Sequence, residues 1–388
     1  MELKQLPFPS FFARLALAGL TAWAFFLLGC GGTMTSTQTG QAMGLQGQVH
    51  GGQQAVAGAT VTLYAVTTGG YGAAASTLAT TTTLGGGHFS FPAYTCTTLT
   101  DANHPDPDIY IVATGGDAGA GANSAIALMA ALGPCTAIQS ADPFVAVNEV
   151  TTVGAVYALA PFIGAGTAGA QISTSTGNVS GLFNAFVTAN ELVNTGGGGS
   201  PGTLVPAATV PTSEIYTLAD VIAGCVNSTG SGSPGCTNLF TDATPPGGSA
   251  PTNTIDAMLN IARFPGQNVA SICALALASA PFQPGIDCTN APPNDWTISV
   301  NYSSGIFSPL FLAIDGSNRI WVVGNATVSV LGNNGAQAGF SPISIAAGPR
   351  GIAIDSSGNA WVTIYNNGSG NSVNEYLGAD GTNPTTVT

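Results

Sequence analysis

The sequence predicts a multidomain protein that is mainly β, with an α-helical middle. Three observations lead to this fold class. Strand-like segments separated by Gly and Thr fill residues 44–134, and apolar residues three and four apart dominate residues 143–281. A pattern that begins at Leu312 returns at Ile352. We therefore expect a β-sandwich at 44–141, a small helical bundle at 142–290 and a partial β-propeller at 291–388.

The first 29 residues have the three parts of an export signal. Lys4 and Arg14 precede a charge-free, mostly apolar run from Leu15 to Leu28, and small residues follow. A membrane-spanning helix is the alternative interpretation, but crossing the hydrocarbon core takes about 20 apolar residues. Because the apolar run covers only residues 15–28, we expect residues 1–29 to be a signal peptide.

The end of this leader, Leu27-Leu28-Gly29-Cys30, resembles the lipobox of bacterial lipoproteins. In that family a signal peptidase cuts before the cysteine, which then carries lipid. The resemblance implies lipidation of Cys30, a membrane partner and a place in the cell envelope, at the outer membrane or the cell surface. An ordinary signal peptide with a chance cysteine is the other interpretation. The composition of residues 31–41 suits a flexible tether over 30–43.

The charge balance argues against one class of function. The chain holds 18 acidic and 5 basic residues, with a net charge of −13. Nucleic acid binding needs clustered Lys and Arg, so no nucleic acid partner is expected. Charged residues make up 6% of the chain, against roughly 25% in ordinary soluble domains. Uncharged Thr, Ser, Asn, Gly and Ala must therefore supply most of the surface.

Six further cysteines indicate disulfide bonds, because the chain is expected to be exported. Many pairings are possible, and the sequence alone fixes none of them. The preferred pairing closes each loop inside one expected domain. Metal ligation is the alternative, although no C-x-x-C motif occurs and all three histidines lie in the first half of the chain. The preferred pairs are Cys96 with Cys135, Cys225 with Cys236, and Cys273 with Cys288.

Residues 44–141 carry strand motifs in a recognisable order. They are Gly47-Gln48-Val49, then Ala55 to Leu63, Thr81 to Thr83, Gly87 to Phe91 and Tyr110 to Ala113. This order resembles the carboxypeptidase-regulatory-like, transthyretin-like sandwich, a small all-β module. The resemblance implies that Gly58, Ala59 and Gly87 shape turns. Because that family is non-catalytic in itself, it also implies a structural or adhesive spacer.

Five segments between residues 142 and 290 show helical periodicity. Their apolar stripes, such as Ile215, Leu218 and Ile222, are typical of residues that pack into a core. We expect these helices to form the small bundle. The five segments are 149–162, 181–193, 213–226, 254–263 and 269–278.

The clearest internal repeat joins residues 312–323 to residues 352–363. Asp315 and Trp321 of the first copy return as Asp355 and Trp361 in the second. A strand, an Asp-containing turn and a Trp-containing strand, repeated at about 40 residues, is typical of a propeller blade. These residues resemble the NHL and virginiamycin-B-lyase-like repeats. We expect each Asp to cap its turn and each Trp to pack between blades.

Two such blades fit before residue 388, whereas propellers have about 4 to 8. The sequence is therefore expected to be a fragment, or part of an open or oligomeric assembly.

The search for catalytic motifs returns little. Residues 198–202 spell G-x-S-x-G, but Pro201 has no N–H to offer an oxyanion. Residues 164–169 spell G-x-G-x-x-G, but they follow a helical segment. We interpret both segments as loops. One dense polar run could bind a divalent cation through its carboxylates; it consists of Asp101, His104, Asp106 and Asp108. Because prolines separate the acids, we interpret it instead as a solvated loop. No metal and no cofactor are expected.

The predicted function is that of a non-catalytic cell-surface lipoprotein, a membrane-anchored modular display or binding protein. A protein or a carbohydrate would bind to the propeller. The alternative is a propeller enzyme, lyase-like or lactonase-like, whose catalytic blades lie beyond residue 388. The lyase relatives are expected to use histidine with a metal, and the two blades present contain no histidine.

Overall fold

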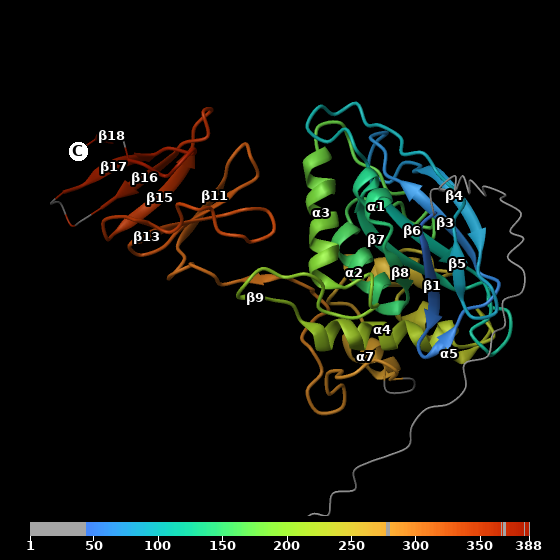
Figure 1. Cartoon of the computed structure of the whole chain (residues 1–388). Helices are drawn as coiled ribbons and strands as arrows, with labels where there is room; N and C mark the ends of the chain where they lie inside the picture. The colour runs from blue at the N-terminus through green and yellow to red at the C-terminus, as the bar shows by residue number, and fades with distance from the viewer. Residues whose placement is uncertain (1–43, 277–279, 366, 368–369, 384, 388) are drawn as a thin grey trace, which may run out of the picture. The chain divides into compact units, whose positions relative to one another are not determined.

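The computed structural model describes residues 44–276, 280–365, 367, 370–383 and 385–387. The predicted signal peptide, Cys30 and the tether therefore lie outside the described residues. Within these residues the chain forms seven helices and five separate sheets, and none of the sheets closes into a barrel (Figure 1). No helix among them has the length and apolar character needed to cross a membrane.

Strand β1 (Gln46–Gly51) organises the first sheet. It pairs antiparallel with β2 (Gln54–Ala55) and β5 (His88–Ser90). On its other side it pairs in parallel with β8 (Phe144–Val147). Since β8 comes from the segment expected to be helical, the first sheet draws on both 44–141 and 142–290.

The second sheet has the antiparallel order β4-β3-β6-β7. Its strands are β4 (Ser76–Thr82), β3 (Thr60–Ala65), β6 (Asp108–Thr114) and β7 (Ala127–Pro134). In β3, Val61, Leu63 and Ala65 are buried and alternate with more exposed residues, which is the pattern of a strand with one face in the core. Strands β6 and β7 are buried on both faces along almost their whole length, because helices cover the face that β3 leaves half-exposed.

The five helices expected from periodicity are all present. They are α2 (Glu149–Leu159), α3 (Val179–Leu192), α4 (Thr212–Val226), α6 (Thr254–Arg263) and α7 (Val269–Ala276). Two short helices were not expected, α1 (Cys135–Ala141) and α5 (Pro234–Asp242). Helices α2, α3 and α6 pack against β7 (Figure 1). One hydrophobic core contains residues of both sheets and all seven helices, so the helices are not a bundle with a core of their own.

Helical side chains satisfy the free edge of β7, which is the last strand of its sheet. The Thr152 hydroxyl of α2 accepts from the Met129 N–H at 2.9 Å. The Thr254 hydroxyl of α6 accepts from the Ala127 N–H at 3.0 Å and donates to the Ala127 carbonyl. At the far end, the Asn190 amide of α3 donates to the Leu132 carbonyl. An edge that would otherwise be buried without partners is thereby closed.

The described C-terminal residues form three small sheets. Strand β9 (Ala208–Thr209) pairs with β10 (Asn301–Tyr302). The first repeat contributes β11 (Phe311–Ile314) and β12 (Ile320–Val323) to a four-stranded sheet with β13 (Thr327–Leu331) and β14 (Ile343–Ser344). The second contributes β15 (Pro349–Ile354) and β16 (Ala360–Ile364) to a sheet with β17 (Ser372–Tyr376) and β18 (Thr385–Val387). These two repeat sheets share a hydrophobic core of their own.

Replacing Thr254 with Val is expected to lower the free energy of unfolding by about 1 to 3 kcal/mol, because the Ala127 N–H and carbonyl lose their partner inside the core. Denaturant-induced unfolding measures this change. The control is Thr237→Val, an exposed helical threonine whose hydroxyl bonds a backbone carbonyl, where a loss below about 0.5 kcal/mol is expected. Equal losses in the two variants would contradict the closure of the β7 edge by Thr254.

Candidate functional site

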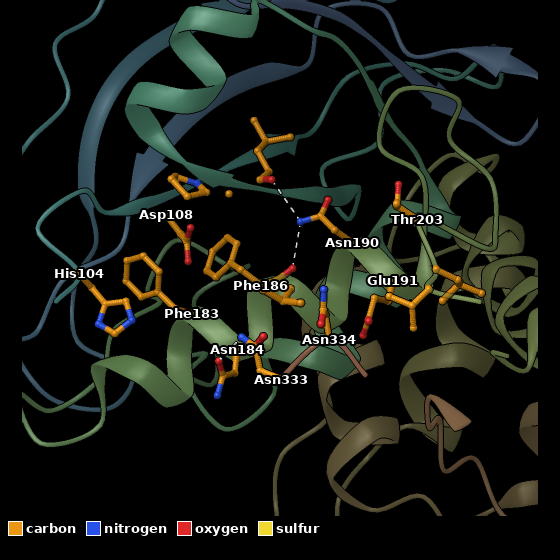
Figure 2. A pocket seen from close by; sticks show the side chains of 16 residues that line it. His104, Asp108, Phe183, Asn184, Phe186, Asn190, Glu191, Thr203, Asn333 and Asn334 are labelled. Carbon is orange, nitrogen blue, oxygen red and sulfur yellow. Dashed lines mark hydrogen bonds between the residues drawn. The ribbon is translucent and has the colours of Figure 1, made fainter. Parts of the chain in front are cut away.

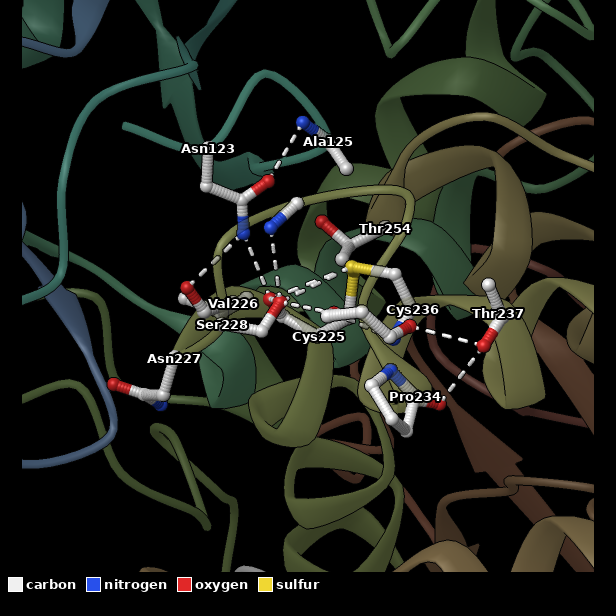
Figure 3. The surroundings of a disulfide bond; sticks show 12 residues. Asn123, Ala125, Cys225, Val226, Asn227, Ser228, Pro234, Cys236, Thr237 and Thr254 are labelled. Carbon is white, nitrogen blue, oxygen red and sulfur yellow. Dashed lines mark hydrogen bonds between the residues drawn. A yellow bond between two sulfur atoms is a disulfide. The ribbon is translucent and has the colours of Figure 1, made fainter. Parts of the chain in front are cut away.

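The three predicted disulfide pairs are confirmed: Cys96–Cys135, Cys225–Cys236 and Cys273–Cys288. Figure 3 shows the second of these, which joins the end of α4 to α5. Beside it the Asn123 side chain donates to the Cys225 carbonyl at 2.8 Å, and its oxygen accepts from the Ala125 N–H. The bond thus fixes α5 and α4 next to the loop that leads into β7.

Within the described residues, the one cluster with suitably spaced ligand atoms for a metal is Cys96, Asp106 and Cys135. The two cysteines are bonded to each other, so neither offers a thiolate. Asp106 accepts instead from the backbone and the hydroxyl of Thr136. The Asp101 carboxylate faces His104, 3.2 Å from its Nδ1. The polar run at 101–108 therefore does not converge on one cation.

The repeat residues Asp315 and Trp321 form a hydrogen-bonded turn. One oxygen of Asp315 accepts from the N–H groups of Ser317 and Arg319, at 2.9 and 3.0 Å. The other accepts from the indole N–H of Trp321 at 2.9 Å. Burial opposes ionisation here, but these hydrogen bonds outweigh it and lower the pKa of Asp315. Through these hydrogen bonds Asp315 caps its own turn.

The second copy repeats this geometry. Asp355 accepts from the N–H groups of Ser357 and Asn359 and from the Trp361 indole at 3.0 Å. The indole hydrogen bond is the main cause that lowers the pKa of Asp355. Both carboxylates are thus occupied by their own hairpins, which assigns them a structural role.

Both glycine motifs are loops closed by the protein itself. The N–H groups of Gly166 and Ala168 point to the carboxylate of Asp256, at 3.2 and 3.4 Å. The Ser200 hydroxyl donates to the Leu192 carbonyl at 2.8 Å. Neither motif is open to a phosphate or to a substrate carbonyl.

The best candidate for a ligand site is a cavity of about 460 Å³ beside α3. Its walls are mostly apolar. Helix α3, the ends of β6 and β7 and the loop after α3 supply most of them, and His104, Asn333 and Asn334 complete the lining (Figure 2). Figure 2 shows Asp108, Phe183 and Phe186 gathered at one part of the cavity. The residues used below are Asp108, Phe183, Phe186, Val187 and Glu191.

Two buried carboxyl groups lie in the wall of this cavity. Asp108 is 1% exposed and Glu191 is 3% exposed. Within the described part of the chain, one oxygen of each, Asp108 Oδ2 and Glu191 Oε1, has no hydrogen-bond partner. The other oxygen of Glu191 accepts from the Tyr302 hydroxyl at 2.5 Å. Each of the two carboxyl groups therefore keeps one oxygen that could bond a molecule entering the cavity.

The electrostatics of the cavity restrict what it can hold. Burial, followed by the nearby charge of Asp106, raises the pKa of Asp108 well above its usual range. Burial also raises the pKa of Glu191, against the opposing effect of the Tyr302 hydrogen bond. The described lining contains no Lys or Arg. The one basic side chain of the described lining, His104, already faces Asp101. An anion would therefore find no free counter-charge there, whereas an uncharged or cationic molecule with hydrogen-bond donors fits.

Sequence patterns singled out one of the two cavity acids, Asp108. Asp108 was recognised as polar, but as part of a solvated loop. Glu191 was placed in a helix without a role. It lies about half a turn round α3 from the buried stripe that contains Leu182 and Ala189, so no pattern of the sequence marked it as buried.

A third buried acid, Glu149, has a different environment. Both of its oxygens accept from the Gly52 N–H, at 2.8 and 3.0 Å. Burial raises the pKa of Glu149 to about 8, although the Gly52 hydrogen bond opposes the shift, and the charge of Asp220 adds to it. Glu149 therefore ties the β1–β2 turn to the first residue of α2.

No family model, no curated protein and no solved structure matches this chain.

Stability is expected to fall as the pH rises toward 8. A folded-state pKa of about 8 for Glu149 lies above the ordinary value of 4.5, so the folded chain binds this proton more tightly than the unfolded chain. The resulting stability is complete below pH 4.5 and is lost as the pH rises through 8, by an amount on the order of a few kcal/mol. Urea unfolding at a series of pH values measures it.

The Glu149→Gln variant should show a smaller slope between pH 6 and 8 than the wild type, because Glu149 no longer contributes; Asp108, whose pKa is also raised by burial, keeps its own share. A slope below pH 6 should remain, because burial raises the pKa of Asp220 to about 6. The control is Asp142→Asn, which removes a charge at a half-exposed position. If Glu149→Gln kept the wild-type slope up to pH 8, the buried acid would not be its source.

Proposed function

We propose that this chain is an exported, non-catalytic binding protein, anchored to the cell envelope by lipid on Cys30, whose ligand enters the cavity beside α3. The observation that carries the binding role is the pair of partnerless carboxyl oxygens, on Asp108 and Glu191. Leaving such groups buried and unpaired costs about 1 to 3 kcal/mol each. A ligand that donates hydrogen bonds to them would offset this cost.

The chemistry of the walls defines the ligand class. Phe183, Phe186 and Val187 offer apolar surface, and the two acids offer acceptors at the wall. The ligand is therefore a small molecule with an apolar body, one or more N–H or O–H donors and no negative charge. An amine or a hydroxylated ring meets these demands.

Three features support export and anchoring. The three disulfides suit an oxidising compartment. The Leu27 to Cys30 segment has the form of a lipobox, and the following residues suit a tether. The low charged fraction of 6% suits an exported protein with an uncharged polar surface.

The finer architecture belongs to the same proposal. The two N-terminal sheets would form a transthyretin-like sandwich, with the helices packed on one of its faces. The two C-terminal sheets would be propeller-type blades, and their matching Asp–Trp turns support this assignment. Their loops would offer a second surface, to a protein or a carbohydrate.

The cavity is expected to bind N-phenylnaphthylamine, a neutral aromatic amine whose fluorescence rises in apolar sites. Titration should give saturable binding at one site. Val187→Trp fills the cavity from α3 and should weaken binding about tenfold or more, or roughly 1.4 kcal/mol. Thr188→Trp, the neighbouring α3 residue outside the lining, is the control and should leave binding unchanged. Equal binding by both variants would rule out this cavity as the site.

Acyl labelling tests the anchor. Cells fed with a labelled fatty acid should incorporate it into the wild-type protein and not into Cys30→Ala, which should also leave the membrane fraction. Thr33→Ala, a change in the tether, should retain both label and membrane association. Labelled, membrane-bound Cys30→Ala would refute lipidation at this residue.

A further inference from the structure

The two repeat sheets pack through opposite faces. In the first, Trp321 and Val323 of β12 are buried. In the second, the buried residues of β16 are Ala360, Val362 and Ile364. Residues of a strand alternate between two faces. Trp361 corresponds to Trp321, so the second sheet buries the face that lacks its tryptophan. The two sheets therefore stack head to tail. The Trp321 face of the first sheet packs against the face of the second sheet that carries Ala360 and Val362.

In the second repeat sheet, one face is covered by the first repeat sheet, and the internal repeat shows which residues of the first sheet correspond to it. Ile352 and Ile354 lie opposite Val362 and Ala360 across the β15–β16 ladder, so they share the face that packs on the first sheet. Both belong to the common core of the two sheets. Their counterparts in the first sheet are Leu312 and Ile314, forty positions earlier.

No other part of the described chain covers Leu312 and Ile314. Leu312 is 67% exposed and Ile314 is 61% exposed. Phe307 and Leu310, just before them in the chain, are also more than half exposed. Apolar surface gathered in this way marks an interaction site. At β13 the same face is already covered, because the Ser329 hydroxyl donates to the Gly305 carbonyl. The open part is therefore the β11 and β12 side.

We propose that the open face of the first repeat sheet, at Leu312 and Ile314, binds the outer Trp361 face of the second repeat sheet in another copy of this chain. The internal repeat argues for this occupant, because the same two kinds of face already pack against each other within one chain. The contact continues an interface that the molecule has already built. Such an interface is heterologous, so copies add head to tail and form a ring or a filament.

The outer face of the second sheet is suited to a weak contact. Trp361 is half-buried and available. Thr363 and Glu375, however, stand where the first sheet has Val323 and Val330. These polar replacements reduce the apolar area offered, and only the β11 and β12 side of the partner face is open. We therefore expect association in the micromolar range. Anchoring many copies in one membrane would raise their effective concentration.

Sedimentation equilibrium of the full-length mature chain, in density-matched detergent, tests the proposal. Wild type should show concentration-dependent association beyond a dimer. Leu312→Glu places a charge on the open face of the first repeat sheet, and Thr363→Glu places one on the outer face of the second. Burying either charge is costly, so each variant should weaken self-association about tenfold or more. Leu84→Glu is the matched control, since Leu84 is 70% exposed in the N-terminal part, and it should associate like wild type.

Mixing the two single variants tests whether the contact joins two different faces. Each retains the face that the other has lost, so an equimolar mixture should form dimers and nothing larger. A wild-type chain that stays monomeric at the highest concentration would overturn the proposal. So would association that neither substitution weakens, or a mixture that does not form dimers.

Discussion

The closure of the β7 edge by threonine hydroxyls is the contact on which the N-terminal part of the structure depends. An open strand edge can be buried only if its N–H and carbonyl groups find partners. Thr152 and Thr254 supply them at Met129 and Ala127. The local sequence places Thr152 correctly, because Asn148 caps α2 through a reciprocal pair of hydrogen bonds with Thr151. The helices can then cover the sheet, and both share one core.

Buried acids occur in two kinds of environment, which differ in whether both carboxyl oxygens have hydrogen-bond partners. Both oxygens of Glu149 are used by the Gly52 N–H, so this acid fastens a turn to a helix. Asp108 and Glu191 are as deeply buried, yet each keeps an oxygen without a partner. The two acids of the second kind lie in the wall of the same cavity. Burial does not distinguish Glu149 from Asp108 and Glu191. The carboxyl oxygens without hydrogen-bond partners do.

Sequence reasoning succeeded where the pattern is local. Alternation predicted β3, apolar stripes predicted five of the helices, and keeping each loop inside one expected domain predicted the disulfide pairs. Strand β7 was missed because Ala127–Pro134 is rich in Ala, Leu and Met and is buried on both faces, which removes the alternation. Helix α5 was missed although Ser233 followed by Pro234 is a helix-start signal. The cavity could not be predicted, since it depends on α3 packing across β7, a contact between distant segments that no local pattern encodes. For the repeat, sequence predicted the Asp–Trp spacing but not the hydrogen bond that joins the two side chains.

The placement of the disulfides divides the protein by its response to redox conditions. The last cysteine of the chain is Cys288, so covalent cross-links hold only the part built on the two N-terminal sheets. The repeat sheets contain hairpins whose contacts join residues close in sequence. In each hairpin an aspartate accepts a hydrogen bond from the indole of a tryptophan six residues later. These hairpin contacts need no oxidant, whereas the cross-links of the preceding part exist only once its thiols are oxidised.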